Sequence, residues 1–215
     1  IADPDAPEFQ QTLKLALHLA FGLGMIAALV GGLFATPLVA LLFGYGALAV
    51  DGVAGIADTL AILMIGLPFQ AMVQALTAGL NAAKRTRVVL WIMVLAMLGA
   101  LAIFGGLRLG GMSWGGAACL GFVAFHAVSF GLAFWFALGR AGLGILPELA
   151  WTGLKLAGPA GAVAFLSPAA RMQDNVTVST LALICILGLL LLFIIRPLLR
   201  QLAALRERAS DPAPL

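Results

Sequence analysis

Residues 88–107, VVLWIMVLAMLGALAIFGGL, contain no charged side chain and decide the class of this protein. A helix needs about 20 apolar residues to cross a bilayer, and this stretch supplies them. The chain of 215 residues is 63% hydrophobic and only 10% charged, with a mean hydropathy of +1.11. A water-soluble surface needs far more charge, so the sequence predicts an all-α, polytopic transmembrane helical bundle. The other charge-free stretches are residues 15–50, 59–83, 109–139, 156–170 and 175–195.

Prolines, glycines and charged turns divide the apolar sequence into six expected membrane spans. We expect kinks near Pro37 in the first span and at residues 66–68 in the second, and the fifth span contains Pro159. The glycine-rich residues 105–116 are expected to link spans three and four, and residues 139–147 to form a loop. The expected spans are residues 9–43, 54–82, 88–104, 117–138, 148–166 and 176–195.

The basic residues divide unevenly between the two sides of the membrane when six spans alternate in direction. Of the 12 Lys and Arg residues, one side receives only Arg108 and Arg171. Basic residues favour the cytoplasmic side of membrane proteins, so we predict that both ends of the chain are cytoplasmic. The basic residues on the predicted cytoplasmic side are Lys14, Lys84, Arg85, Arg87, Arg140, Lys155, Arg196, Arg200, Arg206 and Arg208.

The same pattern disfavours several classes of function. The net charge of +3 could suggest a nucleic-acid partner, but the basic residues lie in short clusters that membrane topology explains, so we expect none. Cys119 and Cys185 lie in apolar runs and the only histidines are His18 and His126, so we expect no metal site. We interpret both histidines as hydrogen-bonded groups inside the bundle. Because no catalytic triad or phosphate-binding loop is recognisable, we expect neither an enzyme nor a bound cofactor.

Polar side chains form a row in the second expected span. Gln70 and Gln74 are one helical turn apart, and Asn81 follows about two turns later. An amide in hydrocarbon is costly, so the row either lines a polar cavity or forms hydrogen bonds to neighbouring helices. Asp58, at the other end of this span, either belongs to the same polar row or caps the helix.

The densest charge cluster is Lys84-Arg85-Thr86-Arg87, on a turn that the charge division places in the cytoplasm. The three cations Lys84, Arg85 and Arg87 could bind phosphate headgroups through charge-assisted hydrogen bonds. They could instead serve only as an anchor that fixes the topology. Kinked, glycine-rich helices with few intramembrane polar groups are typical of transporters that alternate between two faces.

Three motifs lie in the order PLVALLFGYGA at residues 37–47, GLP at residues 66–68 and LNAAKRTRV at residues 80–88. This order resembles the MviN/MurJ family of lipid II flippases, within the multidrug/oligosaccharidyl-lipid/polysaccharide exporter superfamily. The resemblance continues through the glycine-rich link and the two trailing spans, and so covers nearly the whole chain. It implies a fourteen-helix bundle with cytoplasmic ends, of which this chain, starting at Ile1, would supply the last six helices.

The function implied by the resemblance is movement of lipid II, an undecaprenyl-diphosphate-linked peptidoglycan precursor, across the bacterial inner membrane. Residues 1–138 would be part of the second lobe of the transport core, residues 139–200 two further helices, and residues 201–215 a cytoplasmic tail. The cations of residues 84–87 would attract the diphosphate. The implied partners are the lipid-linked oligosaccharide, membrane lipids and the N-terminal helices of the same protein. The alternatives are a flippase for another polyprenyl-linked glycan, a multidrug exporter of that superfamily, or a non-transporting membrane subunit.

Overall fold

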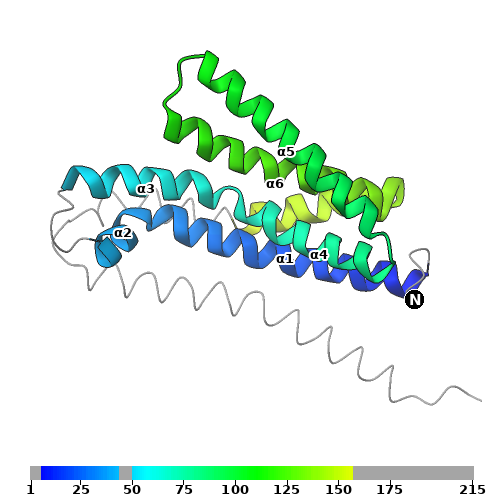
Figure 1. Cartoon of the computed structure of the whole chain (residues 1–215). Coiled ribbons are helices and arrows are strands. Elements are labelled where there is room, and N and C mark those ends of the chain that lie inside the picture. Colours follow the sequence, from blue (N-terminus) through cyan, green and yellow to red (C-terminus); the bar gives the residue numbers. More distant parts are fainter. Residues whose placement is uncertain (1–5, 44–49, 157–215) are drawn as a thin grey trace, which may run out of the picture. The chain divides into compact units, whose positions relative to one another are not determined.

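The computed structural model describes residues 6–43 and 50–156, and every regular element in these ranges is a helix (Figure 1). An all-α architecture is therefore confirmed for the described residues. The expected sixth span, the second half of the fifth and the C-terminal tail lie outside them. The elements are α1 (Pro7–Leu33), α2 (Ala35–Phe43), α3 (Val50–Met64), α4 (Leu67–Ala82), α5 (Thr86–Leu109), α6 (Trp114–Leu138), the 3-10 helix η1 (Gly139–Ile145) and a helix over residues 146–156.

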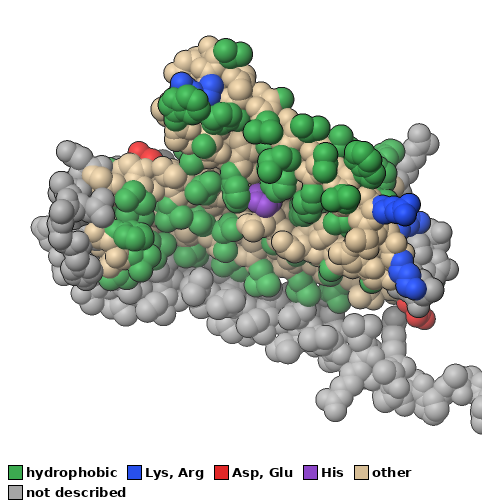
Figure 2. Space-filling view, in the orientation of Figure 1, with side chains coloured by type: hydrophobic (Ala, Val, Ile, Leu, Met, Phe, Trp, Pro, Cys, Tyr) green, Lys and Arg blue, Asp and Glu red, His purple; other side chains and the backbone are tan. Residues whose placement is uncertain are grey.

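Three described helices, α1, α5 and α6, are each long and apolar enough to cross a membrane. The bent pair α3 and α4 passes the same test as one span, which makes up to four candidates within the described ranges. Apolar side chains are spread over the visible face of the described helices (Figure 2), and Leu90 and Trp91 on α5 are 64% and 63% exposed. This exposure would be unfavourable in water and is compatible with a membrane protein.

The second expected span is broken where the sequence predicts. Pro68 has no N–H to donate to the carbonyl of Met64, and its ring would clash with that carbonyl in a continuous helix. The chain instead tightens, with the N–H of Ile65 donating to Ile62 O at 3.2 Å and that of Gly66 to Leu63 O at 2.9 Å. The two helical segments on either side meet at 41°.

The first expected span breaks earlier than predicted. The kink was expected near residues 36–37, but α1 ends at Leu33 and α2 begins at Ala35, with Phe34 between them. The reason is again the missing N–H of a proline, because Pro37 leaves the carbonyl of Leu33 without its usual donor four residues later. Two backbone hydrogen bonds continue the helical pattern on either side of Phe34. The N–H of Phe34 donates to Val30 O at 3.0 Å, and the N–H of Leu38 donates to Phe34 O at 2.9 Å.

The connection between α5 and α6 is shorter than the expected link over residues 105–116. α5 continues through Gly105 and Gly106 to Leu109, and α6 begins at Trp114. A glycine inside a helix costs only about 1 kcal/mol, so a well-defined helix end elsewhere overrides it. That end is Gly111, whose φ of +86° suits glycine alone. Ser113 then caps α6 by accepting a hydrogen bond from Gly116 N–H at 3.2 Å. The expected loop at residues 139–147 is also largely helical, as η1 and the start of the next helix.

The helices pack in a definite order (Figure 1). α1 lies along α4 and also contacts α3, α2 packs on α3, and α6 packs on α3, α4 and α5. α5 contacts mainly α6 and so lies at the edge of the described bundle. The main core unites α1, α4, α5, α6, η1 and the helix over residues 146–156. Its buried side chains are Leu13, Leu17, Met72, Leu76, Leu80, Ile92, Ala133, Phe134, Leu138, Ile145 and Leu149.

Glycines on α1 allow it to approach the broken span closely. A Cβ added at Gly24 would lie 2.7 Å from Pro68 Cα and 3.1 Å from Leu67 O, and one at Gly31 would clash with the side chain of Met64. Small residues at helix contacts of this kind are typical of membrane bundles. The two glycines therefore allow α1 to pack against both sides of the break.

We expect Gly24→Ala to lower the free energy of unfolding, by about 1–3 kcal/mol, because the new methyl group meets backbone atoms that cannot move aside easily. Gly105→Ala is the matched control, since a Cβ there has no neighbour within 4 Å. The control should gain up to about 1 kcal/mol from helix propensity. Denaturant titration of both variants in mixed micelles measures the difference, and equal stabilisation would contradict the close approach of α1 to Pro68.

Candidate functional site

The predicted cation cluster lies on the turn that joins α4 to α5. Lys84 has a φ of +58°, the left-handed conformation that glycine usually adopts at this position after a helix. The N–H of Arg85 donates to Leu80 O at 2.8 Å and that of Lys84 to Asn81 O at 2.9 Å. These two bonds form a Schellman motif. The turn therefore has a fixed backbone although all three cations on it are exposed.

The same cations surround the N-terminus of α5. Arg85 is the residue before the first helical turn, Arg87 lies within that turn, and neither an acidic residue nor a side-chain cap neutralises it. The N-terminus of a helix carries a partial positive charge and exposes unpaired N–H groups. Cations at this position are electrostatically unfavourable for the helix unless an anion lies nearby. The arrangement is therefore suited to binding a phosphate group.

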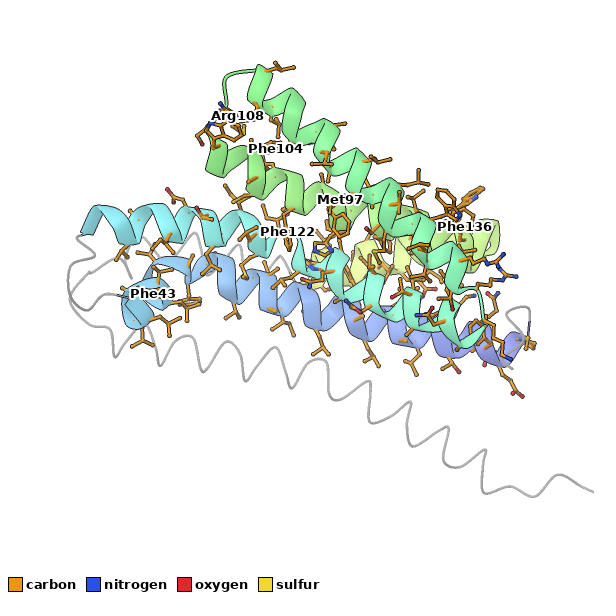
Figure 3. The ribbon with its side chains drawn as sticks, viewed as in Figure 1. Phe43, Met97, Phe104, Arg108, Phe122 and Phe136 are labelled. Carbon is orange, nitrogen blue, oxygen red and sulfur yellow. The ribbon has the colours of Figure 1, made fainter. Side chains whose placement is uncertain are left out.

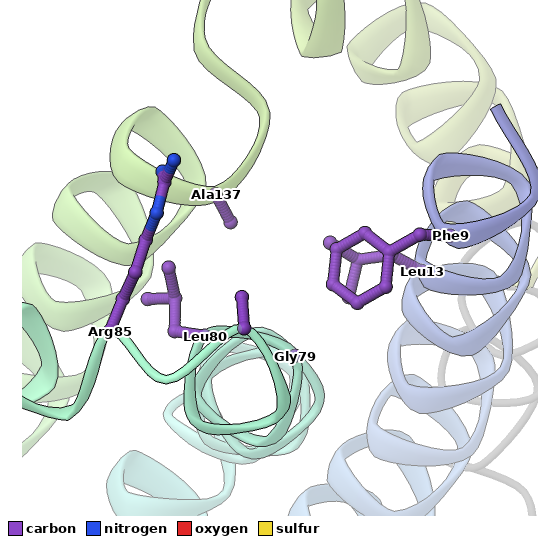
Figure 4. A pocket seen from close by; sticks show the side chains of 7 residues that line it. Phe9, Leu13, Gly79, Leu80, Arg85 and Ala137 are labelled. Carbon is purple, nitrogen blue, oxygen red and sulfur yellow. The ribbon is translucent and has the colours of Figure 1, made fainter. Parts of the chain in front are cut away.

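A small crevice adjoins this turn at the end of the bundle (Figure 4). Its volume is about 10 Å³, which is room for about one water molecule. The cation turn is thus a surface site rather than the floor of a substrate cavity. The crevice is lined by Phe9, Leu13, Gly79, Leu80, Ala83, Arg85 and Ala137.

The predicted amide row lies on one outer face of α4. Gln70 is half-buried, whereas Gln74 and Asn81 are exposed. The opposite face of the helix, with Met72, Leu76 and Leu80, is buried in the core. Within the described residues the three amide side chains have no hydrogen-bond partner, so the second alternative, hydrogen bonds to neighbouring helices, is not realised among these helices. The row faces away from the described bundle and ends at the cation turn, where Asn81 O accepts from Lys84 N–H.

Asp58 does not cap the second expected span. α3 begins at Val50, so Asp58 lies in the middle of this helix, where its side chain is exposed. The helix extends further towards the N-terminus than the apolar pattern indicates, because Gly52 and Gly55 do not end it. The interpretation of Asp58 as a helix cap is therefore wrong.

The two histidines differ in their hydrogen bonds. His18 is bonded as predicted, with Nδ1 at 2.9 Å from Lys14 O and Nε2 at 3.3 Å from a carboxylate oxygen of Glu148. This pair joins α1 to the helix over residues 146–156. His126 on α6 is buried, and within the described residues its Nδ1 has no partner, contrary to the prediction. Its ring packs in T-shaped contacts with Phe122 and Phe125, with ring centroids 4.5 and 5.1 Å apart.

Sequence analysis missed a second polar end of the molecule, at the connection between α5 and α6. The guanidinium of Arg108 lies 4.1 Å above the ring of Trp114 and donates a hydrogen bond to Met112 O. The available signal was a lone Arg six residues before a Trp, at the end of an apolar run. Only the fold shows that the two side chains meet.

The Schellman motif at Lys84 yields a stability prediction. Lys84→Gly and Lys84→Ala remove the same charge, but only glycine adopts a positive φ without strain. We expect the glycine variant to be more stable than the alanine variant by about 1 kcal/mol in denaturant titration. Gly111, at the equivalent position of the motif that ends α5, is the control, and Gly111→Ala should be destabilising. Equal stabilities of the two Lys84 variants would contradict the left-handed conformation.

Comparisons with protein-family models, with curated proteins and with solved structures find no match. A functional hypothesis for this chain starts from the cation turn, the amide row and the order of its sequence motifs.

Proposed function

We propose that this chain is the C-terminal part of a MurJ-like flippase that moves lipid II across the bacterial inner membrane. The observation that carries the proposal is the cation turn. Three exposed cations surround an uncapped helix N-terminus, directly at the end of a row of outward-facing amides. A polyprenyl-diphosphate sugar has the complementary order of groups, with an anionic diphosphate, a polar glycan and an apolar tail.

The diphosphate is the part of such a substrate that the turn suits best. Arg and Lys side chains form charge-assisted hydrogen bonds to phosphate oxygens that are roughly twice as strong as neutral ones. The partial positive charge of the α5 N-terminus adds to the same field. Because the crevice beside Arg85 holds only about one water molecule, the turn would attract the diphosphate at the surface, as an entrance does.

The amide row supplies the second argument for transport. In hydrocarbon, an amide without a partner is costly. Gln70 and Gln74 therefore need a partner beyond the described helices, and the proposed partners are the glycan of the substrate and the N-terminal helices of the same protein. The proposed transport of the substrate requires neither ATP nor a cofactor bound to this chain.

The proposed topology has six spans with both ends in the cytoplasm. α5 separates Arg87 from Arg108 by 21 residues, or about 32 Å of helix, close to the thickness of a bilayer core. The cation-rich end would be cytoplasmic by the positive-inside rule.

Cysteine labelling tests this topology. In a chain with Cys119→Ser and Cys185→Ser, we expect a cysteine at Thr86 to react with a membrane-impermeant maleimide only from the cytoplasmic side. A cysteine at Gly110 should react only from the opposite side. Both positions are exposed, so the reagent can reach them. Labelling of both from one side would contradict α5 as a membrane span.

The cation turn is tested with the combined variant Lys84→Gln, Arg85→Gln and Arg87→Gln in the full-length protein, reconstituted in vesicles with lipid II. We expect the rate of lipid II flipping to fall at least about tenfold, because one lost hydrogen bond to a charged group is worth about 1.5–3 kcal/mol. Lys155→Gln is the matched control for loss of a cation outside the turn, and it should leave the rate unchanged.

Three outcomes would count against the proposal in different ways. An unchanged rate in a correctly inserted triple variant would reduce the turn to a topological anchor. Transport of another polyprenyl-linked glycan or of a cationic drug, but not of lipid II, would favour the related exporters. Absence of any transport, with a partner protein purifying in stoichiometric amount, would favour a non-transporting membrane subunit.

A further inference from the structure

An apolar groove runs between α5 and α6 on the surface of the bundle. Its volume is about 430 Å³, within the range of about 300–1,000 Å³ that is usual for small-molecule sites. The groove is separate from the cation turn, which lies at the other end of α5. Its walls include Met97, Leu101 and Phe104 of α5 and Ala118, Phe122 and Phe125 of α6.

Both walls of the groove point at one end towards a polar site at Arg108. On α5 the wall residues recur every three to four positions from Met97 to Phe104, and Arg108 is the next position on that stripe. On α6 the stripe of Ala118 begins one turn earlier, at Trp114. Phe104 and Trp114 pack together with ring centroids 5.8 Å apart, so the aromatic wall is continuous with the Arg108 site. Figure 3 shows Arg108 and Phe104 near the connection between the helices, with Met97 farther along.

Arg108 has more hydrogen-bonding capacity than its neighbours use. Its Nη1 donates to Met112 O and its guanidinium covers the ring of Trp114, but its Nε is buried and has no acceptor among the described residues. No acidic side chain in the described part of the chain forms a salt bridge with it. A guanidinium presents five N–H donors in a planar fork that suits phosphate. The end of the groove next to the α5–α6 connection therefore adjoins a positive charge with unused donors.

We infer that this groove binds one acyl chain of a membrane phospholipid, with the phosphate of the same lipid bound by Arg108. The groove supplies apolar walls and its end supplies the opposite charge to a phosphate. The helix from Met97 to Arg108 is about 16 Å long, which matches one leaflet of a hydrocarbon core about 30 Å thick. The bound lipid thus belongs to the leaflet at the end of α5 opposite to the cation turn.

The chemistry of the groove favours a phospholipid over a docked helix. An apolar helix would fill the groove but would leave Arg108 without an anion. An acidic helix would place charge against walls that expose almost no polar atoms. A phospholipid satisfies both parts at once, because its anionic and apolar portions are joined end to end. This inference is independent of the proposed transport function and holds for a flippase, an exporter or a subunit alike.

Photo-crosslinking of the full chain in phospholipid vesicles tests the site. The probe is phosphatidylglycerol with a diazirine in one acyl chain, and cross-linked peptides are mapped by mass spectrometry. We expect cross-links at Met97, Leu101 and Phe125. Diacylglycerol with the same labelled chain, which lacks the phosphate, should give cross-links there at least about tenfold less often, as expected for loss of a charge-assisted hydrogen bond.

Two variants with matched controls separate the parts of the site. Arg108→Gln should reduce the phosphatidylglycerol cross-links to the level of diacylglycerol, whereas Lys155→Gln, at another cation that lies over a Trp ring, should not. Ala118→Trp should block the groove, whereas Ala102→Trp, on an exposed position of α5 outside the groove, should not.

The inference is overturned by any of three results. Equal cross-linking of phosphatidylglycerol and diacylglycerol in the unchanged chain would show that the site does not recognise the phosphate. Cross-links spread evenly over α5, without loss in Ala118→Trp, would show ordinary solvation by lipid. A protein–protein cross-link from the groove, formed instead of the lipid cross-links, would show that another part of the chain or a second copy covers it.

Discussion

The missing N–H of Pro68 is the constraint on which the described bundle depends. Without a donor to the carbonyl of Met64, the second span divides into α3 and α4 and changes direction by 41°. α1 follows this change because Gly24 allows it to contact the backbone of Pro68 itself. α6 packs on both halves of the broken span. A glycine on α1 and a proline on α4 thus determine how the main core of the described helices is assembled.

α5, also long and apolar enough to cross a membrane, differs from this broken pair of helices. It has no proline, continues through three glycines and contacts mainly α6, so most of its apolar surface is not covered by the described helices. A Schellman motif lies on each side of α5. The first ends α4 and has Lys84 in the left-handed position, and the second ends α5 itself and has Gly111 there. The glycine costs nothing there, whereas the lysine costs about 1 kcal/mol. The chain therefore carries a cation where its backbone alone would favour glycine, which is consistent with a role for the charge.

Sequence reasoning succeeded where the cause of a feature is local. The break at residues 66–68 depends on proline chemistry within one turn, and the all-α class depends on apolar content, so both were visible without coordinates. The extent of the link at residues 105–116 was not, because glycine propensity is a weak preference that Gly111 and Ser113 override. The position of the first kink was also missed by a few residues, since the proline acts on a carbonyl four residues earlier.

The candidate sites divide in the same way. The cluster of Lys84, Arg85 and Arg87 is contiguous in sequence and needed no structure to find it. The groove between α5 and α6 depends on which stripes of two apolar helices face each other, and an apolar helix without a polar face gives no sign of that. The sequence likewise placed Arg108 and Trp114 in the expected link over residues 105–116. Only the short connection between α5 and α6 shows that their side chains are in contact.

The unpaired amides of α4 bear on what lies beside the described helices. Gln70 and Gln74 lie on the same helix as the buried Leu76. They nevertheless point away from the main core and have no hydrogen-bond partner within the described ranges. Leaving a buried amide without a hydrogen bond costs about 1–3 kcal/mol, and hydrocarbon offers no compensation. Lipid alone is therefore a poor neighbour for this face, although it suits the exposed face of α5 well. The two faces therefore suit different surroundings: that of α4 suits a polar partner or a water-filled space, and that of α5 suits lipid.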